Sequence, residues 1–382
     1  MATATVEQKL EVDKLSTWLE INRDAVTHNL DRIYRWIMPG AEILAVIKSN
    51  AYGHGLIEIA RAAADHAAYF GVSHISEALV LRQLYLEKPI LLFGIPPERD
   101  VETAIRSKIT LSVSSLSEAE LISNIANKLS KSVNVHIKID TGMGRLGIRW
   151  PEAVSNIRQI AALDSIHLEG IYTHFPEGAS DQDSFTMQQI KVFMDIIDEA
   201  SGKGIHFAYR HAANSLGILN YKESHLNLVR PGITLYGIKP SSGMMSKIPL
   251  KPVLSWRARI ILVKKLKTGE STGYNRLYKA SHDTTIGILP VGYSHGYPFA
   301  LSNRGLVLYR GKRYPIAGQV SMDYVAVDFG ADMDDIHAGE VVTLLGSDGD
   351  DAVTAEILAE RAGTIPYVIV TQLNLALPRF LV

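Results

Sequence analysis

A lysine stands at the end of an apolar run near the start of the chain. Lys48 closes the run ILAVIK (43–48), which is typical of a buried strand. Such a lysine either extends its charged end to the surface or pairs with a carboxylate. Alternatively, removal from water or proximity to other cations makes its amine a nucleophile that forms Schiff bases. The strand pattern alone leaves both interpretations open.

The ends of later apolar runs carry a cationic and polar set of groups. Its members are Lys138, Asp140, His174, His211, Asn214, Ser215, Arg230 and the backbone of Gly232 and Ile233. With so few carboxylates, the set predicts neither a divalent metal site nor a glycosidase pair. It favours a phosphorylated ligand, bound by the Ser215 hydroxyl, the Asn214 amide and the flexible backbone at Gly232. Ser215 would ordinarily cap a helix, which is compatible with that role.

Eight short apolar runs, separated by helical patterns, position these residues. The runs are ILAVIK (43–48), YFGVS (69–73), ILLFG (90–94), ITLSV (109–113), VNVHIKID (133–140), LEGIYTHF (168–175), HFAYRHAAN (206–214) and LVRPGITLYG (228–237). Near-continuous apolar runs are typical of parallel strands buried on both faces. The helical patterns include the stripe Val26, Leu30, Ile33 and Ile37, and a capping box at 115–118.

Eight strand–helix units predict an α/β fold with a (β/α)8 barrel of the TIM type, whose reactive residues gather at the C-terminal ends of the strands. A doubly wound open sheet is the alternative, but the chain has no Gly-rich dinucleotide turn. From about residue 246 the sequence becomes rich in strands. We therefore predict a flexible tail over 1–13, a barrel over 14–245 and a mostly-β domain over 246–382. The early run TWLEIN (17–22) is a candidate partner strand for that second domain.

Composition narrows the function classes. The 382 residues carry 39 basic and 40 acidic side chains, for a net charge of −1. This balance gives no electrostatic reason to expect a nucleic acid or an anionic membrane as a partner. The absence of cysteine excludes disulfides, thiolate metal sites and cysteine nucleophiles. No run approaches the length of a membrane span and the start is polar, so we expect a cytoplasmic protein.

The surroundings of Lys48 resemble a known motif. The segment AVIKSNAYGHG (45–55) closely resembles the pyridoxal-phosphate attachment motif of alanine racemases. Further stretches agree with that family in order and spacing, from about residue 16 to the C-terminus. They are HIKIDTGMGRLG (136–147), YTHF (172–175), HAANS (211–215), VRPGITLYG (229–237), GYNRLY (273–278), PVGY (290–293), VSMD (320–323) and IPY (365–367).

The resemblance implies a pyridoxal-phosphate-dependent isomerase that interconverts L-alanine and D-alanine and so supplies D-alanine for peptidoglycan. It also implies a head-to-tail homodimer that completes each active site across the interface. Lys48 would hold the cofactor and act as one acid/base. Tyr274 of the partner subunit would act on the opposite face, because racemisation removes a proton from one face and returns one to the other.

The same resemblance implies roles around the cofactor. A chain of contacts from Tyr274 through His174 to Arg230 and His211 would lower the pKa of the tyrosine so that it can act as a base. Arg230 would contact the pyridine nitrogen and keep it unprotonated, because a guanidinium does not release its proton. A weaker electron sink of this kind disfavours transamination. The phosphate positions resemble Tyr52, Ser215, Gly232, Ile233 and Tyr367.

Other positions concern the substrate. Arg145 resembles the residue that touches the cofactor's phenolic oxygen and the substrate carboxylate. Lys138 matches a lysine often carbamylated in this family, which would orient Arg145. Tyr293 and Met322 from the partner resemble residues that narrow the entrance and contact the substrate carboxylate. We expect Asp323 to have a structural role, not a catalytic one. Without the motifs, Tyr274 would be a half-buried aromatic, Lys138 an ion-pair partner of Asp140, and both histidines core residues.

The chain departs from the family pattern at His295, at Phe299 and over PEGASD (176–181), which bears on dimer contacts and substrate range more than on reaction type. Three alternatives stay open. One is a racemase for serine or another amino acid. The aromatic gate at Tyr293 and Tyr278 argues against the larger substrates, because it favours an amino acid with a small side chain. A barrel decarboxylase of basic amino acids would need a cysteine that is missing. A non-catalytic pyridoxal-phosphate carrier would need no Tyr274.

Overall fold

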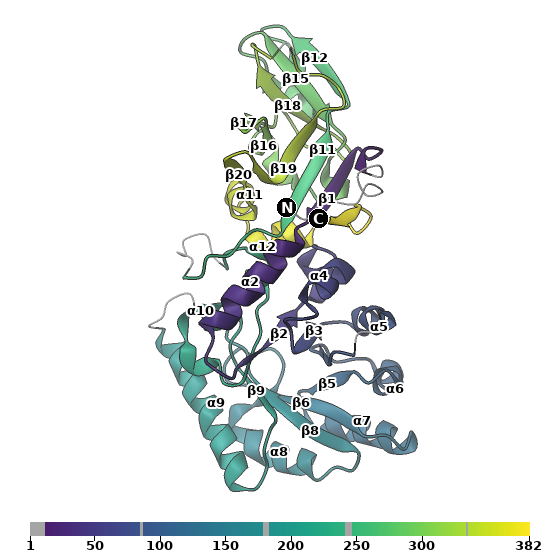
Figure 1. Ribbon diagram of the computed structural model, residues 1–382, viewed down its shortest axis with the longest axis vertical. Coiled ribbons are helices and arrows are strands. Elements are labelled where there is room, and N and C mark those ends of the chain that lie inside the picture. Colours follow the sequence, from purple (N-terminus) through teal and green to yellow (C-terminus); the bar gives the residue numbers. More distant parts are fainter. Residues whose placement is uncertain (1–11, 85–86, 179–182, 241–246, 334) are drawn as a thin grey trace.

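The computed structural model describes residues 12–84, 87–178, 183–240, 247–333 and 335–382. Most of the tail predicted over 1–13 therefore lies outside the described residues. Figure 1 shows two bodies along the long axis, a strand–helix body and a β-rich body, with the C-terminus near their junction. The boundary predicted at 245 falls within the undescribed 241–246, so the domain limits stay a prediction.

The strand–helix body is built on parallel strands that follow one another in chain order. Within the described residues, eight of them form the order β10-β2-β3-β4-β5-β6-β8-β9, with β7 (Ile148–Arg149) paired beside β6. Their bounds are β2 Glu42–Val46, β3 Tyr69–Val72, β4 Ile90–Leu92, β5 Thr110–Val113, β6 Val133–Asp140, β8 Ile166–Tyr172, β9 Tyr209–His211 and β10 Leu228–Val229.

The backbone between the last two strands closes the ring. The amide of Asn227 donates to Arg210 O at 3.4 Å, and that of Arg230 donates to Ala213 O at 3.0 Å. The strands β3 and β5 are buried along their whole length, as expected when side chains on one face fill the barrel and those on the other face meet helices. The predicted barrel is confirmed, and the open sheet is wrong.

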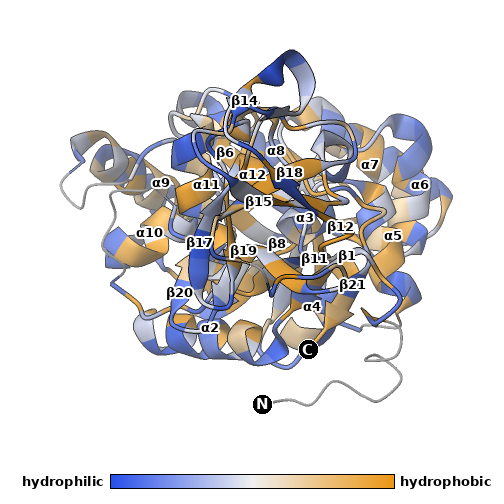
Figure 2. Cartoon of the chain, turned by 90° about the horizontal axis from the view of Figure 1, so that it is seen from above, coloured by the Kyte–Doolittle hydropathy of each residue, from blue (hydrophilic) through white to orange (hydrophobic). Residues whose placement is uncertain are grey.

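Helices surround these strands with their apolar faces inward (Figure 2). They are α2 Arg23–Trp36, α4 Leu56–Ala63, α5 Ile75–Gln83, α6 Glu98–Arg106, α7 Leu116–Lys128, α8 Ala153–Ala161, α9 Ser184–Gly202 and α10 Ser215–Asn220. The element α3 Lys48–Tyr52 is a short turn with left-handed backbone inside it. The predicted stripe on α2 is buried, and Asn22 caps this helix by accepting from the amide of Ala25. Ser115 caps α7 as predicted, although the carboxylate of Glu118 accepts from Ser114.

The β-rich body carries the remaining strands and two helices. Their bounds are β1 Thr17–Ile21, β11 Leu254–Arg259, β12 Leu262–Leu266, β13 Ser271–Thr272, β14 Tyr278–Lys279, β15 Thr284–Leu289, β16 Leu306–Tyr309, β17 Lys312–Pro315, β18 Val325–Gly330, β19 Val341–Asp348, β20 Asp351–Val353, α11 Ala355–Ala362, α12 Pro366–Thr371 and β21 Arg379–Leu381. Short 3-10 helices lie at Trp150–Glu152, Lys222–Ser224, Ile233–Tyr236, Tyr274–Arg276, Tyr293–His295 and Phe299–Leu301.

The first strand of the chain belongs to this second body. The larger sheet has the order β17-β16-β19-β11-β1-β21, and β1 runs antiparallel to β11, with Leu19 opposite Trp256. A smaller sheet has the order β12-β15-β18. Buried and partly exposed residues alternate along β11, as in a sheet with one covered face. The pairing expected for TWLEIN is therefore observed, and it ties the start of the chain to its second half.

Close contacts at the junction bring the C-terminal segment to the barrel. A Cβ atom on Gly53 would lie 1.9 Å from the carbonyl oxygen of Val370, so only glycine permits this approach of α12 to the end of α3. Arg379 donates from Nε to Gly53 O at 3.0 Å. These contacts place α12, with Tyr367, at the mouth of the barrel.

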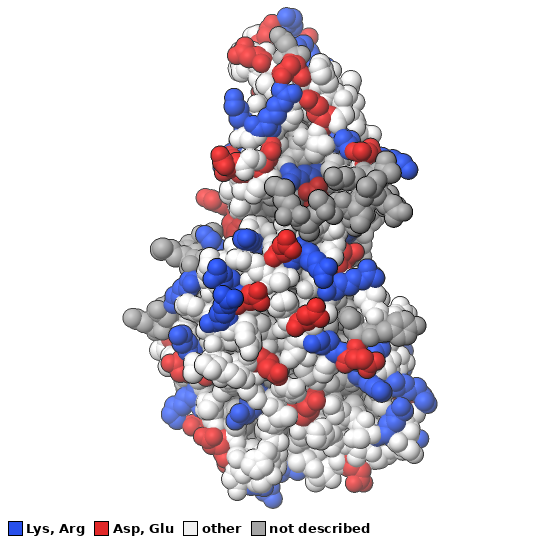
Figure 3. Space-filling model, in the orientation of Figure 1, with Lys and Arg blue, Asp and Glu red and all other residues white. Residues whose placement is uncertain are grey.

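The described surface shows no concentration of one sign of charge on the face drawn in Figure 3, where Lys and Arg are interspersed with Asp and Glu. Among the described helices, none has the length and apolarity needed to cross a membrane.

Candidate active site

A cavity of about 400 Å³ opens at the C-terminal ends of the barrel strands. Its lining combines cations, hydroxyls and aromatic rings: Val46, Lys48, Ser49, Tyr52, Phe93, Lys138, Arg145, Tyr172, His174, Asn214, Ser215, Leu216, Arg230, Gly232, Ile233, Tyr367 and Thr371. Sequence reasoning placed most of its candidates at these strand ends, and the fold brings them to one cavity. Several of them lie beyond the strand ends. Lys48 follows β2, which ends at Val46, and His174 follows β8, which ends at Tyr172. Asn214 and Ser215 follow β9, which ends at His211.

A left-handed backbone turn follows Lys48. Ser49, Asn50, Ala51 and Tyr52 all have φ between 52° and 56°. This region costs an L-residue about 1–2 kcal/mol, so the surroundings must compensate for it. The amide of Asn50 donates to the Glu77 carboxylate at 3.0 Å, and its side chain accepts from the amide of Leu56 at 2.8 Å. The turn presents both Lys48 and Tyr52 to the cavity.

Small groups form a cradle on one side of the cavity. Ser215 Oγ accepts from the amide of Gly232 at 3.0 Å and from Thr234 Oγ1 at 3.1 Å. A Cβ on Gly232 would lie 2.7 Å from Tyr52 Oη, so glycine leaves this space open. Ser215 and Ile233 are the first residues of helical turns, whose leading amides have no intrahelical acceptor. Such a cradle suits a phosphate.

The helix cap beside this cradle differs from the prediction. Asn214, not Ser215, is the N-cap of α10, and its side-chain oxygen accepts from the amides of Leu216 and Gly217 at 3.1 and 3.0 Å. Its amide nitrogen donates to Phe175 O at 3.1 Å. The Ser215 hydroxyl is consequently not used as a cap and faces the cradle, whereas the Asn214 side chain holds the helix start in place.

Four cations border the cavity, Lys48, Lys138, Arg145 and Arg230. Burial, and then the charge of Arg145, lowers the pKa of Lys48 below that of a free lysine. The same two causes, with help from Arg230, lower the pKa of Lys138 to about 8. Asp140 makes no ion pair with Lys138 in the described chain, since its carboxylate accepts from the amides of Gly142 and Gly144. The cavity is therefore electropositive and suits an anionic ligand.

Arg230 is buried, with 4% of its surface exposed. Its Nη1 donates to His211 Nδ1 at 3.0 Å and to His211 O at 2.9 Å. Its Nη2 donates to the carbonyls of Thr173 and Ala212 at 2.7 and 2.8 Å. The terminal nitrogens thus have acceptors for all their protons, which leaves Nε–H as the remaining donor. No described carboxylate pairs with it, and burial lowers its pKa to about 10.

The histidines of the expected chain occupy different places. His174 lines the cavity, where burial and the Arg230 charge lower its pKa well below the usual value. His211 lies behind Arg230, and its pKa is lowered by the same causes. Tyr172 stacks on His211 at 4.8 Å between ring centres and 5° between planes. Arg230 bonds His211, but in the described residues no hydrogen bond joins it to His174.

Three residues expected to act from the partner subunit lie on the surface of the β-rich body. Tyr274, Met322 and Tyr293 are 66%, 54% and 45% exposed, and none lines the cavity of its own chain. Tyr274 precedes two residues with left-handed backbone, Asn275 and Arg276. The backbone strain therefore lies directly beside Tyr274, and strained backbone clusters at functional positions.

Neighbouring surface positions have structural contacts. Asp323 accepts from Ser294 Oγ at 2.8 Å, which agrees with the structural reading of this residue. His295, one of the departures from the family pattern, accepts through Nδ1 from the amide of Gly292 at 3.2 Å. Phe299, another departure, packs edge-on against Tyr293. Of the PEGASD departure, residues 179–181 lie outside the described residues.

Sequence reasoning missed the polar residues Ser49, Tyr172 and Thr371 of the cavity lining, and also His136 and Glu169, which lie outside that lining. Tyr172 lines the cavity with Lys138 5.6 Å above its ring. His136 lies two residues before Lys138 on β6, and the period-two alternation of a strand would have placed both on the inner face. Glu169 is an acid inside the apolar strand β8, which was the available signal for it.

Comparisons with known proteins cover nearly the whole chain. Residues 21–240 match the family model "Alanine racemase, N-terminal domain", and residues 253–381 match "Alanine racemase, C-terminal domain". The chain is 39% identical over 369 residues to an alanine racemase of Carboxydothermus hydrogenoformans, covering 96% of this chain and 99% of that protein. Identity to an alanine racemase of Desulforamulus reducens is 38%, covering 95% and 98%.

Solved structures agree on the fold. An alanine racemase of Clostridium difficile superposes with a TM-score of 0.92 at 33% identity, covering 97% of this chain and 96% of that one. A histidine racemase of Leuconostoc mesenteroides superposes with a TM-score of 0.88 at 29% identity, covering 97% and 98%. Nearly full coverage in both directions shows that the two bodies occur together in these relatives.

Proposed function

This chain belongs to the alanine racemase family of isomerases, and from that premise we propose that it interconverts L-alanine and D-alanine with pyridoxal phosphate as its cofactor. The observation that carries the proposal is the cavity that combines a half-buried lysine of lowered pKa, Lys48, with a hydroxyl and amide cradle and a buried arginine. In a bacterium the product would supply D-alanine for peptidoglycan. The cytoplasmic location expected from the sequence stays a prediction.

The residues present fit pyridoxal phosphate. The cradle of Ser215, Gly232 and Ile233, with the Tyr52 and Tyr367 hydroxyls, would hold the phosphate. Lys48 would hold the cofactor covalently through Nζ. When bound, the cofactor supplies a carbonyl carbon that condenses with amines and an electron-withdrawing ring that stabilises negative charge at the substrate's α-carbon.

Arg230 would hold the ring nitrogen. Its Nε–H lacks an acceptor among the described residues, and a guanidinium keeps its protons. A nitrogen that accepts a hydrogen bond without being protonated withdraws fewer electrons. We assign Arg230 the role of limiting proton return at the wrong carbon, which would end in transamination.

Racemisation also requires two groups that exchange a proton with the α-carbon from opposite faces. Lys48, whose pKa is lowered by burial and by the charge of Arg145, is the group on one face. On the other face we propose Tyr274 of the partner subunit. An acid/base that is 66% exposed and outside its own cavity supports a homodimer in which the two copies complete each other's sites. The partner's Tyr293 and Met322 would narrow the entrance.

Arg145 would bind the carboxylate of the substrate, and Lys138 would orient Arg145. Arg145 lines the cavity and would bind the substrate carboxylate. Lys138 lies close enough for the Arg145 charge to lower its pKa. Carbamylation of Lys138 would turn this repulsion into an ion pair and hold Arg145 in place.

The test is the absorbance spectrum of the purified protein, followed by an assay for D-alanine formed from L-alanine. L-serine, L-lysine and L-histidine are run alongside, because a histidine racemase shares the fold. We expect a near-ultraviolet to visible cofactor band with fastest turnover of alanine. A band without turnover of any of the four would refute the racemase assignment in favour of a carrier. Lys48→Ala should lose band and turnover together, and Lys131→Ala, on the exposed surface, should lose neither.

A further inference from the structure

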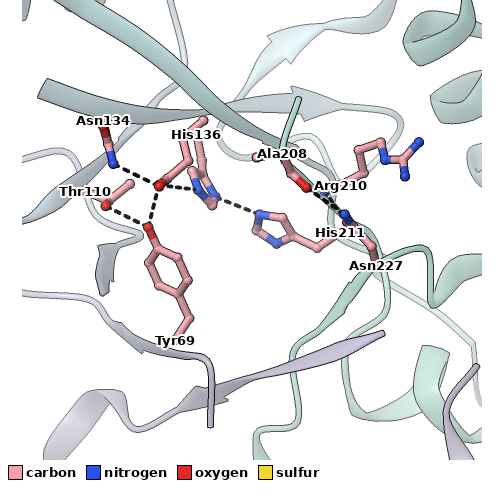
Figure 4. A network of polar contacts seen from close by, with 9 residues as sticks. Tyr69, Thr110, Asn134, His136, Ala208, Arg210, His211 and Asn227 are labelled. Carbon is pink, nitrogen blue, oxygen red and sulfur yellow. Dashed lines mark hydrogen bonds and ion pairs between the residues drawn. The ribbon is translucent and has the colours of Figure 1, made fainter. Parts of the chain in front are cut away.

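A line of polar side chains runs inside the barrel behind Arg230. His211 on β9 contacts His136 on β6, with 2.9 Å between His211 Nε2 and His136 Nδ1. His136 Nε2 lies 3.2 Å from the Glu169 carboxylate on β8. Both histidines are fully buried. Figure 4 shows the two rings joined by a hydrogen bond between their nitrogens, with Tyr69 and Asn134 on the far side of His136. The interior of such a barrel is ordinarily filled by branched apolar side chains, so this line requires an explanation.

Hydrogen-bond chemistry gives the line one direction. Arg230 can only donate, so His211 Nδ1 must accept from it. A neutral His211 then carries its proton on Nε2 and donates to His136 Nδ1. His136 in turn carries its proton on Nε2 and donates to Glu169. Burial lowers the pKa of both imidazoles, which favours the neutral rings that this arrangement needs.

Glu169 ends the line as an acceptor. Its Oε2 also accepts from Tyr69 Oη at 2.5 Å, and its Oε1 accepts from Asn134 Nδ2 at 2.8 Å. Burial raises the pKa of the Glu169 carboxyl, but the hydrogen bonds from His136 and then Tyr69 outweigh it, and the pKa is lowered overall. The carboxylate is thus held in its ionised form, which can only accept hydrogen bonds. His136 Nε2 must therefore be the donor in its contact with Glu169.

The backbone is shaped to admit His136. A Cβ on Gly170, in the neighbouring strand, would lie 2.7 Å from three ring atoms of His136. The ring therefore occupies space that only glycine leaves open. On the other side, Tyr172 stacks flat on His211 and prevents that ring from turning. Both imidazole planes are consequently determined by packing as well as by hydrogen bonds.

We infer that His136 and Glu169 are positioning residues that act through His211 to keep Arg230 oriented as a donor toward the cavity. Without the acceptor at Glu169, His136 and His211 could both move their protons to Nδ1. His211 would then present a donor to the donor on Arg230, and the guanidinium would turn away. Only the expected effect on catalysis rests on the proposed function. In that case Arg230 would no longer hold the ring nitrogen of pyridoxal phosphate.

The first test reads proton positions without cofactor. In protein labelled with 15N-histidine and stripped of cofactor, NMR should show two buried neutral rings protonated at Nε2, identified by their loss in His136→Asn and His211→Asn. Glu169→Leu should shift both rings toward the Nδ1 tautomer, whereas Glu169→Gln, which retains an acceptor oxygen, should not. Unchanged rings in Glu169→Leu, or wild-type rings protonated at Nδ1, would overturn the inference. This reading is independent of whether the protein racemises alanine.

The second test uses the loaded protein. Glu169→Leu should lower kcat about 10- to 100-fold. This is the range found when a hydrogen-bond partner behind a metal-ligating histidine is removed, and Glu169 has the corresponding place behind His136 and His211. KM for alanine should change little, and the fraction of cofactor lost to transamination should rise. Glu169→Gln should recover most of kcat, and Glu120→Gln, an exposed acid on α7, should match the wild type. Equal losses in the Leu and Gln variants would contradict the directional argument.

A third variant covers the case in which Glu169→Leu fails to fold. Gly170→Ala keeps every hydrogen-bonding group of the line but displaces the His136 ring. We expect the same tautomer shift and the same rise in transamination. A Gly170→Ala protein with wild-type rings and wild-type product partition would overturn the inference. If wild-type protein turns over no amino acid while the rings behave as described, the proposed function fails and the inference about Arg230 stands.

Discussion

Carbamylation of Lys138 can be worked out from its environment. The reaction joins the neutral amine to carbon dioxide, forming an N–C bond and releasing one proton. An ordinary lysine with a pKa near 10.5 is neutral in about 0.03% of molecules at pH 7. The pKa of about 8 that burial and Arg145 impose on Lys138 raises this fraction to about 9%, a gain of about 300-fold.

Arg145 favours the modification twice. Its charge lowers the pKa of the amine, and it can pair with the carbamate that forms. Because the lysine pKa is depressed in the folded state, neutral amine is available above about pH 8 and is lost as the pH falls below that value. Arg145→Met should therefore both weaken the carbamate and move its formation to higher pH.

The assay is 13C NMR of the protein in 13C-bicarbonate between pH 6 and 9.5. We expect a carbamate signal with a midpoint near pH 8 that is absent in Lys138→Met and retained in Lys131→Met, an exposed lysine. Lack of any Lys138-dependent signal at pH 8 to 9 would refute the reasoning. So would an Arg145→Met variant whose midpoint and intensity equal those of the wild type.

Three further outcomes follow from the geometry. Tyr274→Phe should keep the cofactor band but slow exchange of the α-proton of L-alanine with solvent by about 100-fold or more, as expected for a lost acid/base, and loss of cofactor with equally slowed exchange from L-alanine and D-alanine would contradict this. Gly232→Ala would put a Cβ 2.7 Å from Tyr52 Oη and should weaken pyridoxal-phosphate binding at least about tenfold in a titration, whereas Gly202→Ala, with open space around it, should not. Asn29→Ala removes three hydrogen bonds, a buried one to Leu235 and two partly buried ones to Lys251. It should lower the apparent free energy of unfolding of cofactor-free protein by about 2–4 kcal/mol in thermal or denaturant melts, and no change would show that these hydrogen bonds do not contribute to stability.

The barrel was predictable because its signals are local. Each buried parallel strand must be apolar on both faces, so the runs around residues 69–73 and 109–113 mark strands without knowledge of their neighbours. The polar groups at the ends of such runs then share one mouth by the geometry of the barrel. Lys48, Lys138 and Arg230 could be grouped on this basis alone.

The finer arrangement of that mouth was decided elsewhere in the chain. The left-handed turn after Lys48 opposes local preference and persists because Glu77, far along the sequence, binds Asn50. Likewise, the N-cap of α10 is Asn214 and not Ser215 as predicted, so the Ser215 hydroxyl is available to the cradle. Single-residue patterns do not show such exchanges, since either side chain can cap a helix.

What the sequence determined by itself was the set of groups and the strands that carry them, because burial periodicity and motif spacing are properties of neighbouring residues. Only the tertiary structure decided how these groups act on one another. The line from Arg230 through His136 to Glu169 joins strands that are distant in sequence, and its direction depends on which nitrogen faces which donor. The exposure of Tyr274 is decided in the same way, because it depends on what the rest of the fold leaves uncovered.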